Sequence, residues 1–158
     1  MMRVFIADDE EIIRDGIRNC IEKEQERFLF AGEAPDGEMA LPMLMEMKPD
    51  VLITDIRMPE MDGFDVLRVM QCYAWQEEIP VIVISAAEDN RSVERAYDMG
   101  VADYIRRPFE RVMVLRRVKN ALMLYAKQKR LTRLVTDQVY EKEHNGVLMI
   151  SILSHVVE

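Results

Sequence analysis

Short apolar runs rich in β-branched residues constrain the fold of this chain more than any other feature. Three runs are nearly continuous and two are weaker; in chain order the five are Val4–Ala7, Phe28–Glu33, Val51–Thr54, Ile79–Ser85 and Ala102–Ile105. Runs that are apolar on both faces are typical of parallel strands, because helices cover both faces of a parallel sheet. The sequence therefore predicts buried parallel strands.

The segments between these runs carry apolar residues at helical spacing. Ile13, Ile17 and Ile21 follow the first run at intervals of four, and Phe64, Leu67 and Met70 follow the third at intervals of three. An alternation of strands and helices implies right-handed crossovers and helices on both faces of the sheet. The predicted fold is α/β, a (βα)5 doubly wound parallel sheet.

The pattern changes after Phe109. One helix is predicted from about Val112 to Glu143, a stretch without Gly or Pro and far longer than the usual ~11–12 residues. Its apolar positions thin out along the chain, which favours a packed start and a weak coiled coil or signalling linker at the end. The segment 144–146 is predicted to break the helix. Val147–Val157, with eight apolar residues in eleven, is predicted to begin a truncated output domain.

Charge is distributed unevenly along the chain. The net charge is −8, yet residues 101–135 carry ten basic and two acidic side chains, whereas residues 1–65 carry seven and seventeen. Because the chain as a whole is acidic, the basic stretch is interpreted as an interaction face and not as a site of direct nucleic-acid binding.

Three observations favour a cytoplasmic protein without a membrane segment. No apolar run approaches the ~20 residues that span a bilayer. The N-terminal run meets Asp8 and Asp9, which is unlike a secretory signal. Cys20 and Cys72 lie in helix-like stretches and are predicted to be reduced core residues.

Carboxylates follow two of the predicted strands. Asp8 and Asp9 come directly after the first run, and Asp55 comes directly after the third. Ligands of doubly wound sheets bind beyond the carboxyl ends of the strands, where these side chains would meet. Such a cluster raises the pKa of one member unless a cation neutralises it, and Mg²⁺ binds a few carboxylates together with water. Taken singly, each aspartate could instead cap a helix or a turn.

Motifs at successive strand ends carry a family resemblance. Asp8-Asp9-Glu10, Leu52–Pro59 with Met61-Asp62-Gly63, Ile84-Ser85-Ala86 and Ala102–Phe109 resemble the bacterial two-component response-regulator receiver domain, over about residues 1–125. The resemblance implies a flavodoxin-like strand order, 2-1-3-4-5, with an extended C-terminal helix. Residues 1–125 are thus predicted to be the receiver domain, and residues 126–158 a helical linker and the start of an output domain.

The resemblance implies a role for each acidic residue. Asp55 would be the phospho-acceptor, which takes a phosphoryl group from a sensor histidine kinase. Asp9 would bind Mg²⁺ directly and Asp8 through water, with Asp55 and the backbone carbonyl of Arg57 as further ligands.

The resemblance also implies roles for residues after the last two strands. Ser85 would donate a hydrogen bond to the phosphoryl oxygen, and Tyr104 would be the aromatic that moves inward on activation. Arg107 stands where the family usually has lysine. Arginine keeps the positive charge, but its guanidinium is planar and can donate hydrogen bonds to two oxygens at once. The Arg107–Pro108 peptide is expected to be cis, because X-Pro bonds adopt cis at little cost.

The chemistry of these residues favours a switch over an enzyme with a turnover substrate. A carboxylate beside a metal is a competent nucleophile, and phosphoryl transfer needs charge neutralisation and positioning. The predicted function is a phosphorylation-dependent switch that relays its state to a C-terminal output. One alternative is a non-phosphorylated pseudo-receiver that serves as a protein-interaction module. Another is a dehalogenase-like phosphohydrolase, which needs a second Asp where this chain has Arg57.

Two weaker resemblances concern the output. The segments 125–129, 137–143 and 148–158 are similar to the linker of receivers that carry HD-type phosphohydrolase outputs, although no metal-binding His-Asp pair is present. The segments 11–16 and 54–59 are instead similar to receivers with helix-turn-helix outputs, so the output stays open.

A homodimer is predicted through the fourth helix, fifth strand and fifth helix, extended by the C-terminal helix. A twofold interface must be self-complementary, which an acidic edge beside a basic edge allows. The acidic edge is Glu88, Asp89, Glu94 and Asp98, and the basic edge is Arg106, Arg111, Arg116, Arg117 and Lys119. Apolar surface would supply the affinity, namely Leu124, Leu131, Val135 and Val147–Val157.

Overall fold

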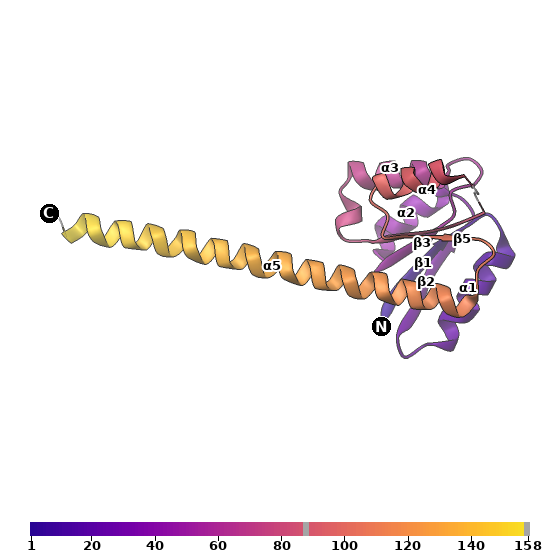
Figure 1. Ribbon diagram of the computed structural model, residues 1–158, viewed down its shortest axis with the longest axis horizontal. Helices are drawn as coiled ribbons and strands as arrows, with labels where there is room; N and C mark the ends of the chain where they lie inside the picture. The colour runs from indigo at the N-terminus through magenta and orange to yellow at the C-terminus, as the bar shows by residue number, and fades with distance from the viewer. Residues whose placement is uncertain (87–88, 157–158) are drawn as a thin grey trace. The chain divides into compact units, whose positions relative to one another are not determined.

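Strands and helices alternate along the chain in the computed structural model, which describes residues 1–86 and 89–156, with side-chain surroundings up to residue 147 (Figure 1). All five apolar runs form strands, with ends that differ from the predicted ones by at most two residues. The elements are β1 (Met2–Ala7), α1 (Glu11–Lys23), β2 (Phe28–Ala34), α2 (Gly37–Met47), β3 (Val51–Thr54), α3 (Gly63–Cys72), a short 3-10 helix η1 (Trp75–Glu77), β4 (Val81–Ser85), α4 (Asn90–Asp98), β5 (Asp103–Arg106) and α5 (Arg111–Val156).

The strands form one parallel sheet in the order β2-β1-β3-β4-β5, which confirms the predicted doubly wound topology. Helices α2, α3 and α4 cover one face, and α1 with the start of α5 covers the other (Figure 1). Alternate residues of each strand enter opposite cores: Phe5 and Leu52 face α2 and α3, whereas Ile6 and Ile53 face α1 and α5. Because both faces are covered, every residue of β3 and β4 is buried.

The predicted break at residues 144–146 is wrong, because α5 continues through Gly146 to Val156. Glycine inside a helix costs only about 0.5–1 kcal/mol relative to alanine, which is too little to end a helix by itself. The ring of His144 also stacks on that of Tyr140, one turn earlier. The side chains of residues 148–158, predicted to be buried in an output domain, lie outside the described surroundings.

The prediction that both cysteines are core residues is wrong for Cys72, whereas Cys20 packs against the core that faces α1 and α5. Cys20 is half-buried and Cys72, the last residue of α3, is exposed. Both are free thiols. The helical spacing that suggested burial does not separate the edge of an apolar stripe from its centre.

The chain divides into two compact units, Met1–Leu122 and Met123–Glu158. The first holds the sheet and both cores. Within the described part of the chain, no helix combines the length and apolar character needed to cross a bilayer.

Candidate functional site

An acidic pocket lies at the carboxyl ends of β1 and β3. Asp8 follows β1 and Asp55 follows β3, and the two strands are neighbours, with Ala7 paired to Thr54. Both carboxylates are buried, at 2% and 4% exposure, whereas Asp9 is exposed. The predicted convergence of Asp8 and Asp55 is therefore present, and Asp9 lies at the rim.

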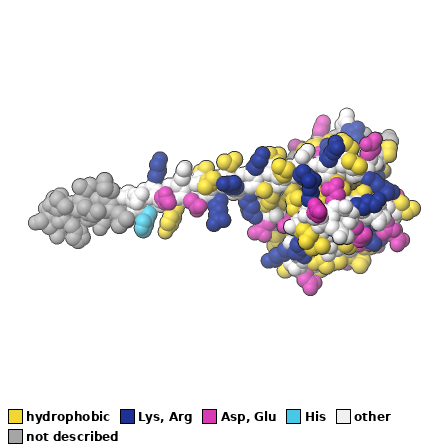
Figure 2. All heavy atoms as spheres, turned by 90° about the horizontal axis from the view of Figure 1, so that it is seen from below, with side chains coloured by type: hydrophobic (Ala, Val, Ile, Leu, Met, Phe, Trp, Pro, Cys, Tyr) yellow, Lys and Arg dark blue, Asp and Glu magenta, His cyan; other side chains and the backbone are white. Residues whose placement is uncertain are grey.

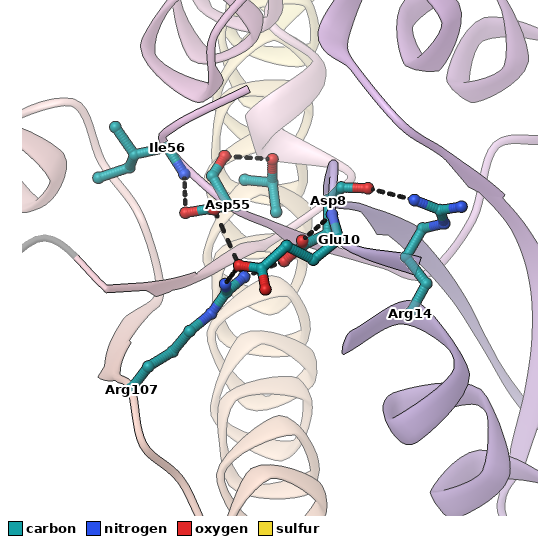
Figure 3. A network of polar contacts seen from close by, with 7 residues as sticks. Asp8, Glu10, Arg14, Asp55, Ile56 and Arg107 are labelled. Atoms are coloured by element: carbon teal, nitrogen blue, oxygen red, sulfur yellow. Dashed lines mark hydrogen bonds and ion pairs between the residues drawn. The ribbon is translucent and has the colours of Figure 1, made fainter. Parts of the chain in front are cut away.

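The backbone around Asp55 holds its side chain in place. The Asp55 backbone N–H donates to the carbonyl of Ala7 (2.8 Å), and its own Oδ1 accepts from the backbone N–H of Ile56 (2.6 Å). The hydroxyl of Thr54 donates to the Asp55 carbonyl (2.9 Å). These bonds leave Oδ2 as the oxygen that faces the pocket (Figure 3).

Arg107 supplies the positive charge of the pocket (Figure 3). Its guanidinium donates to Asp8 Oδ2, to Glu10 Oε1 (2.5 Å) and to Asp55 Oδ2 (3.4 Å), and its side chain is only 10% exposed. The Arg107–Pro108 peptide is cis, as expected. The neighbouring Arg106 is exposed and donates to Asn90 Oδ1 (2.8 Å). Arg107 therefore contacts the carboxylates of the pocket, whereas Arg106 contacts α4.

Burial dominates the electrostatics of Asp8. It raises the pKa of this carboxyl from 3.8 to about 6, against the opposing effects of the Glu10 backbone N–H and of Arg107. The charges of Asp55 and Asp9 add to the rise. The folded protein thus binds this proton more tightly than the unfolded chain does, and ionisation of Asp8 destabilises the metal-free fold as the pH rises from about 4 to above 6.

We expect Asp8→Asn to gain stability relative to the unsubstituted chain as the pH increases. The rise in the pKa of Asp8 from 3.8 to about 6 corresponds to roughly 3 kcal/mol. The unfolding free energy of Asp8→Asn minus that of the unsubstituted chain should therefore increase by up to that amount between pH 4 and pH 7.5. Urea unfolding in EDTA at several pH values measures it. A difference that does not change with pH would contradict this assignment.

Three consecutive carboxylates form a group that can hold a cation. The side-chain oxygens of Asp8, Asp9 and Glu10 lie within 4.8 Å of one another. Hard carboxylate oxygens suit Mg²⁺, which retains several waters when it binds. Asp9 and Glu10 are exposed to solvent, so such waters have room beside them. The donor set therefore fits the predicted ion. Asp55 and the Arg57 carbonyl lie outside this group of three, and their part as ligands stays a prediction.

Ser85 and Tyr104 lie on neighbouring strands. Ser85 ends β4 and is fully buried; Tyr104 lies in β5 and its ring packs in the core beside α4, at 5% exposure. Burial raises the pKa of the Tyr104 hydroxyl, and interaction with the Ser85 side chain opposes this rise. The aromatic expected to move inward thus already lies inside in this structure; its role and that of Ser85 stay predictions.

Sequence reasoning missed two residues of the site. Glu10 was noted only as part of a motif, yet it contacts Arg107. Gly63 begins α3, and its N–H donates to the Ile56 carbonyl (2.9 Å), which places it against the Asp55 backbone. The Met-Asp-Gly motif after β3 was the available signal for Gly63. Asp62 caps α3 there by accepting from the Asp65 N–H (2.8 Å).

Comparison with known proteins supports one family. A family model described as "Response regulator receiver domain" matches residues 4–119. Response regulator RR06 of Streptococcus pneumoniae is 31% identical over 124 residues, which cover 78% of this chain and 54% of that protein. The chain therefore spans about half the length of this relative.

Solved structures agree with this match. The signal receiver domain of the putative response regulator NarL from Mycobacterium tuberculosis is 29% identical, with a TM-score of 0.72 over 77% of this chain and 96% of that one. The isolated REC domain of RcsB from Salmonella enterica, solved in the presence of phosphomimetic BeF3−, is 25% identical, with a TM-score of 0.63 over 70% of this chain and 80% of that one.

Proposed function

Since the chain belongs to the response-regulator receiver family of two-component signalling, we propose that it is a switch operated by phosphorylation of Asp55. The observation that carries the proposal is the buried Asp55 carboxylate at the end of β3, with Asp8 and the cation Arg107 around it. The chain would receive the phosphoryl group from a sensor histidine kinase and pass its state to an output beyond residue 125. We propose that the chain is a signalling switch and not an enzyme with a turnover substrate. We also propose that it acts in the cytoplasm, where the kinase would phosphorylate it.

The proposed reaction is an in-line transfer to Asp55 Oδ2. A bond from this oxygen to phosphorus forms while the bond from phosphorus to the kinase histidine breaks, and the leaving imidazole retains the electron pair. Oδ1 is held by the Ile56 N–H, so Oδ2 is presented to the donor. Ser85, at the end of β4, would donate a hydrogen bond to a phosphoryl oxygen, and Arg107 would move from the carboxylates toward the new negative charge.

Mg²⁺ would be held by Asp9 directly and by Asp8 through water, with Asp55 and the Arg57 carbonyl as further ligands, and Glu10 beside them. When bound, the ion neutralises the charge that gathers on the transferred group. The phosphomimetic in the RcsB receiver structure supports a phosphoryl site of the same kind here.

Stoichiometric labelling by acetyl phosphate with MgCl₂ tests the proposal. A switch should gain one phosphoryl group per chain, detected by intact mass spectrometry, whereas a pseudo-receiver should gain none. Arg107 in place of the usual lysine is the feature that favours the pseudo-receiver, because a planar guanidinium neutralises a single oxygen less compactly than an ammonium does.

We expect Arg107→Ala to tighten Mg²⁺ binding. The guanidinium and the ion are both cations that use the oxygens of Asp8 and Glu10, so removing one strengthens binding of the other. An increase in affinity of about tenfold, or ~1.4 kcal/mol, is expected from isothermal titration with MgCl₂. Arg106→Ala is the matched control, because this side chain contacts Asn90 and not the carboxylates. Weaker binding by Arg107→Ala would contradict competition.

We also propose the homodimer through α4, β5 and α5. Part of the basic edge is already engaged within the chain: Arg117 forms two hydrogen bonds with Asp103, of 2.7 and 2.8 Å, and Arg106 contacts Asn90. Glu88 of the acidic edge lies outside the described residues. Exposed pairs contribute only about 0–1 kcal/mol each, so they would set register more than affinity.

Sedimentation velocity with and without beryllofluoride tests this face. We expect the beryllofluoride-treated chain to dimerise and Arg116→Glu, which reverses one charge of the basic edge, to weaken that response. A beryllofluoride response unaffected by Arg116→Glu would contradict the use of this face.

A further inference from the structure

The guanidinium of Arg14 ties α1 back to the end of β1. Arg14 lies in the first turn of α1, and its Nη1 donates to the backbone carbonyl of Asp8 (2.7 Å; Figure 3). Its own backbone N–H donates to the carbonyl of Glu10 (3.1 Å). The backbone and the side chain of one residue therefore hold both ends of the segment Asp8–Glu10, whose three carboxylates form the candidate cation site.

The bond to the Asp8 carbonyl also orients Asp9. A peptide group is planar, so a fixed carbonyl oxygen fixes the plane that carries the N–H and the Cα of the next residue. Asp8 itself is held from the other side, where its backbone N–H donates to the Ala34 carbonyl (3.1 Å). The point from which the exposed Asp9 carboxylate leaves the backbone thus depends on where Arg14 holds this plane.

Ion pairs are frequent on the first unit, but the contacts of Arg14 differ from them. Figure 2 shows dark-blue basic and magenta acidic side chains on the face that it draws, and Arg68 with Asp65 (2.7 Å) is an exposed pair of this kind. Such pairs contribute little, because solvent screens both charges. The Arg14 side chain is only 13% exposed, and its donor binds a backbone carbonyl, which cannot rotate away.

Glu33 holds Arg14 from the sheet. Its Oε1 lies 3.5 Å from the Arg14 Nε, and Glu33 belongs to β2, where it pairs with Ile6 of β1. Arg18, one turn further along α1, contacts the same carboxylate, and its guanidinium lies 5.1 Å from the centre of the Phe30 ring. The negative charge of Glu33 offsets the positive charge of Arg14, which would otherwise repel a cation at the neighbouring carboxylates.

Arg14 and Arg107 approach the acidic segment in different ways. Arg107 donates to the carboxylate oxygens of Asp8 and Glu10, which are the atoms that a cation would use. Arg14 donates to a backbone carbonyl and does not compete for those oxygens. Charge alone predicts that removing either arginine strengthens cation binding, whereas positioning predicts that removing Arg14 weakens it.

We propose that Arg14 is a positioning residue of the cation site, with Glu33 as its anchor and charge partner. The proposal rests on the proposed function in one respect, the binding of Mg²⁺ at Asp8, Asp9 and Glu10. Residues that orient metal ligands without touching the metal commonly lower its affinity by about 10–100-fold when they are replaced.

Isothermal titration of the full chain with MgCl₂ tests the proposal. Arg14→Met retains an aliphatic stem for packing and removes the donor and the charge. We expect this variant to bind Mg²⁺ about tenfold more weakly than the native chain, although it has lost a nearby cation. Arg14→Lys, which restores a donor and the charge, should recover most of the lost affinity.

Arg18→Met is the matched control. Among the described residues, the Arg18 guanidinium pairs with Glu33 and Asp15 and not with the segment Asp8–Glu10, so its removal should leave the Mg²⁺ affinity unchanged. Urea unfolding of each variant in EDTA shows whether the titrated proteins are folded. Equal weakening by Arg18→Met and Arg14→Met would assign the effect to the charge balance around Glu33 and overturn the proposal.

Glu33→Gln gives a second measurement, which holds even where Arg14→Met does not fold. It keeps the size of the anchor and removes its charge, so Mg²⁺ binding should weaken. Unchanged affinity of Glu33→Gln would overturn its part as charge partner. Native or tighter binding by Arg14→Met would overturn the positioning role, as would an Arg14→Lys that binds no more tightly than Arg14→Met.

Labelling of Asp55 by acetyl phosphate is a separate result. A native chain that binds Mg²⁺ and is not labelled would contradict the switch and leave the role of Arg14 intact. A labelled native chain whose affinity Arg14→Met does not change would leave the switch and remove that role. A native chain that binds no Mg²⁺ would overturn the cation site and the role of Arg14 with it.

Discussion

Asp55→Asn is expected to abolish phosphorylation by acetyl phosphate, from about one phosphoryl group per chain to none. The substitution replaces the nucleophilic Oδ2 with an amide nitrogen and leaves an oxygen that can still accept from the Ile56 N–H. The fold should therefore persist while the chemistry is lost. Intact mass spectrometry after incubation with acetyl phosphate and MgCl₂ measures the effect.

Asp62→Asn is the matched control for this loss. Its side chain lies in the same loop, where it caps α3 by accepting from the Asp65 N–H, and asparagine caps helices about as well as aspartate. Labelling of Asp62→Asn should equal that of the native chain. Undiminished labelling of Asp55→Asn would assign the phosphoryl group to another residue.

Gly63→Ala is expected to produce the largest loss of stability among substitutions near the site. A Cβ at this position would lie 2.2 Å from the Asp55 carbonyl oxygen and 2.9 Å from the Ile56 Cα, both of them backbone atoms that cannot rotate away. The loop after β3 would have to move, at a cost of roughly 3 kcal/mol. Urea unfolding measures this cost, and displacement of the Asp55 backbone should also slow phosphorylation.

Gly16→Ala offers a contrast within the same protein. A Cβ at Gly16, inside α1, meets no atom within 4 Å, and alanine favours a helix over glycine by about 0.5–1 kcal/mol. This variant should be slightly more stable than the native chain. If both glycine substitutions changed the stability equally, steric contact would not explain why position 63 requires glycine.

The fold was predictable because its signals are local and redundant. Val51, Leu52 and Ile53 are apolar in succession, so this strand had to be covered on both faces whatever its neighbours were. Asp8 and Asp55 directly follow strands of one parallel sheet, which was enough to bring them to the same edge. The family resemblance supplied the strand order, which alternation alone left undetermined.

The ion pairs of the pocket were less predictable, because they depend on side-chain reach and not on pattern. Arg107 contacts Glu10 across 97 positions of sequence, and nothing local to either residue signals the other. The continuation of α5 through Gly146 depends on a small energy difference that no single residue determines. Exposure of Cys72 depends on the rotation of α3 about its own axis.

The contact between Arg107 and Asp8 also has a consequence for biosynthesis. The two residues are 99 positions apart, and β5, after which Arg107 lies, is the last strand to be made. At roughly 5–20 residues per second, a ribosome needs on the order of 5–20 s to pass from one to the other. During that interval the nascent chain holds its acidic residues without their counter-charge and leaves β4 as an open edge. Folding of the receiver unit should therefore await the last strand, and premature termination before Arg107 should yield a chain that is degraded and not a partly working switch.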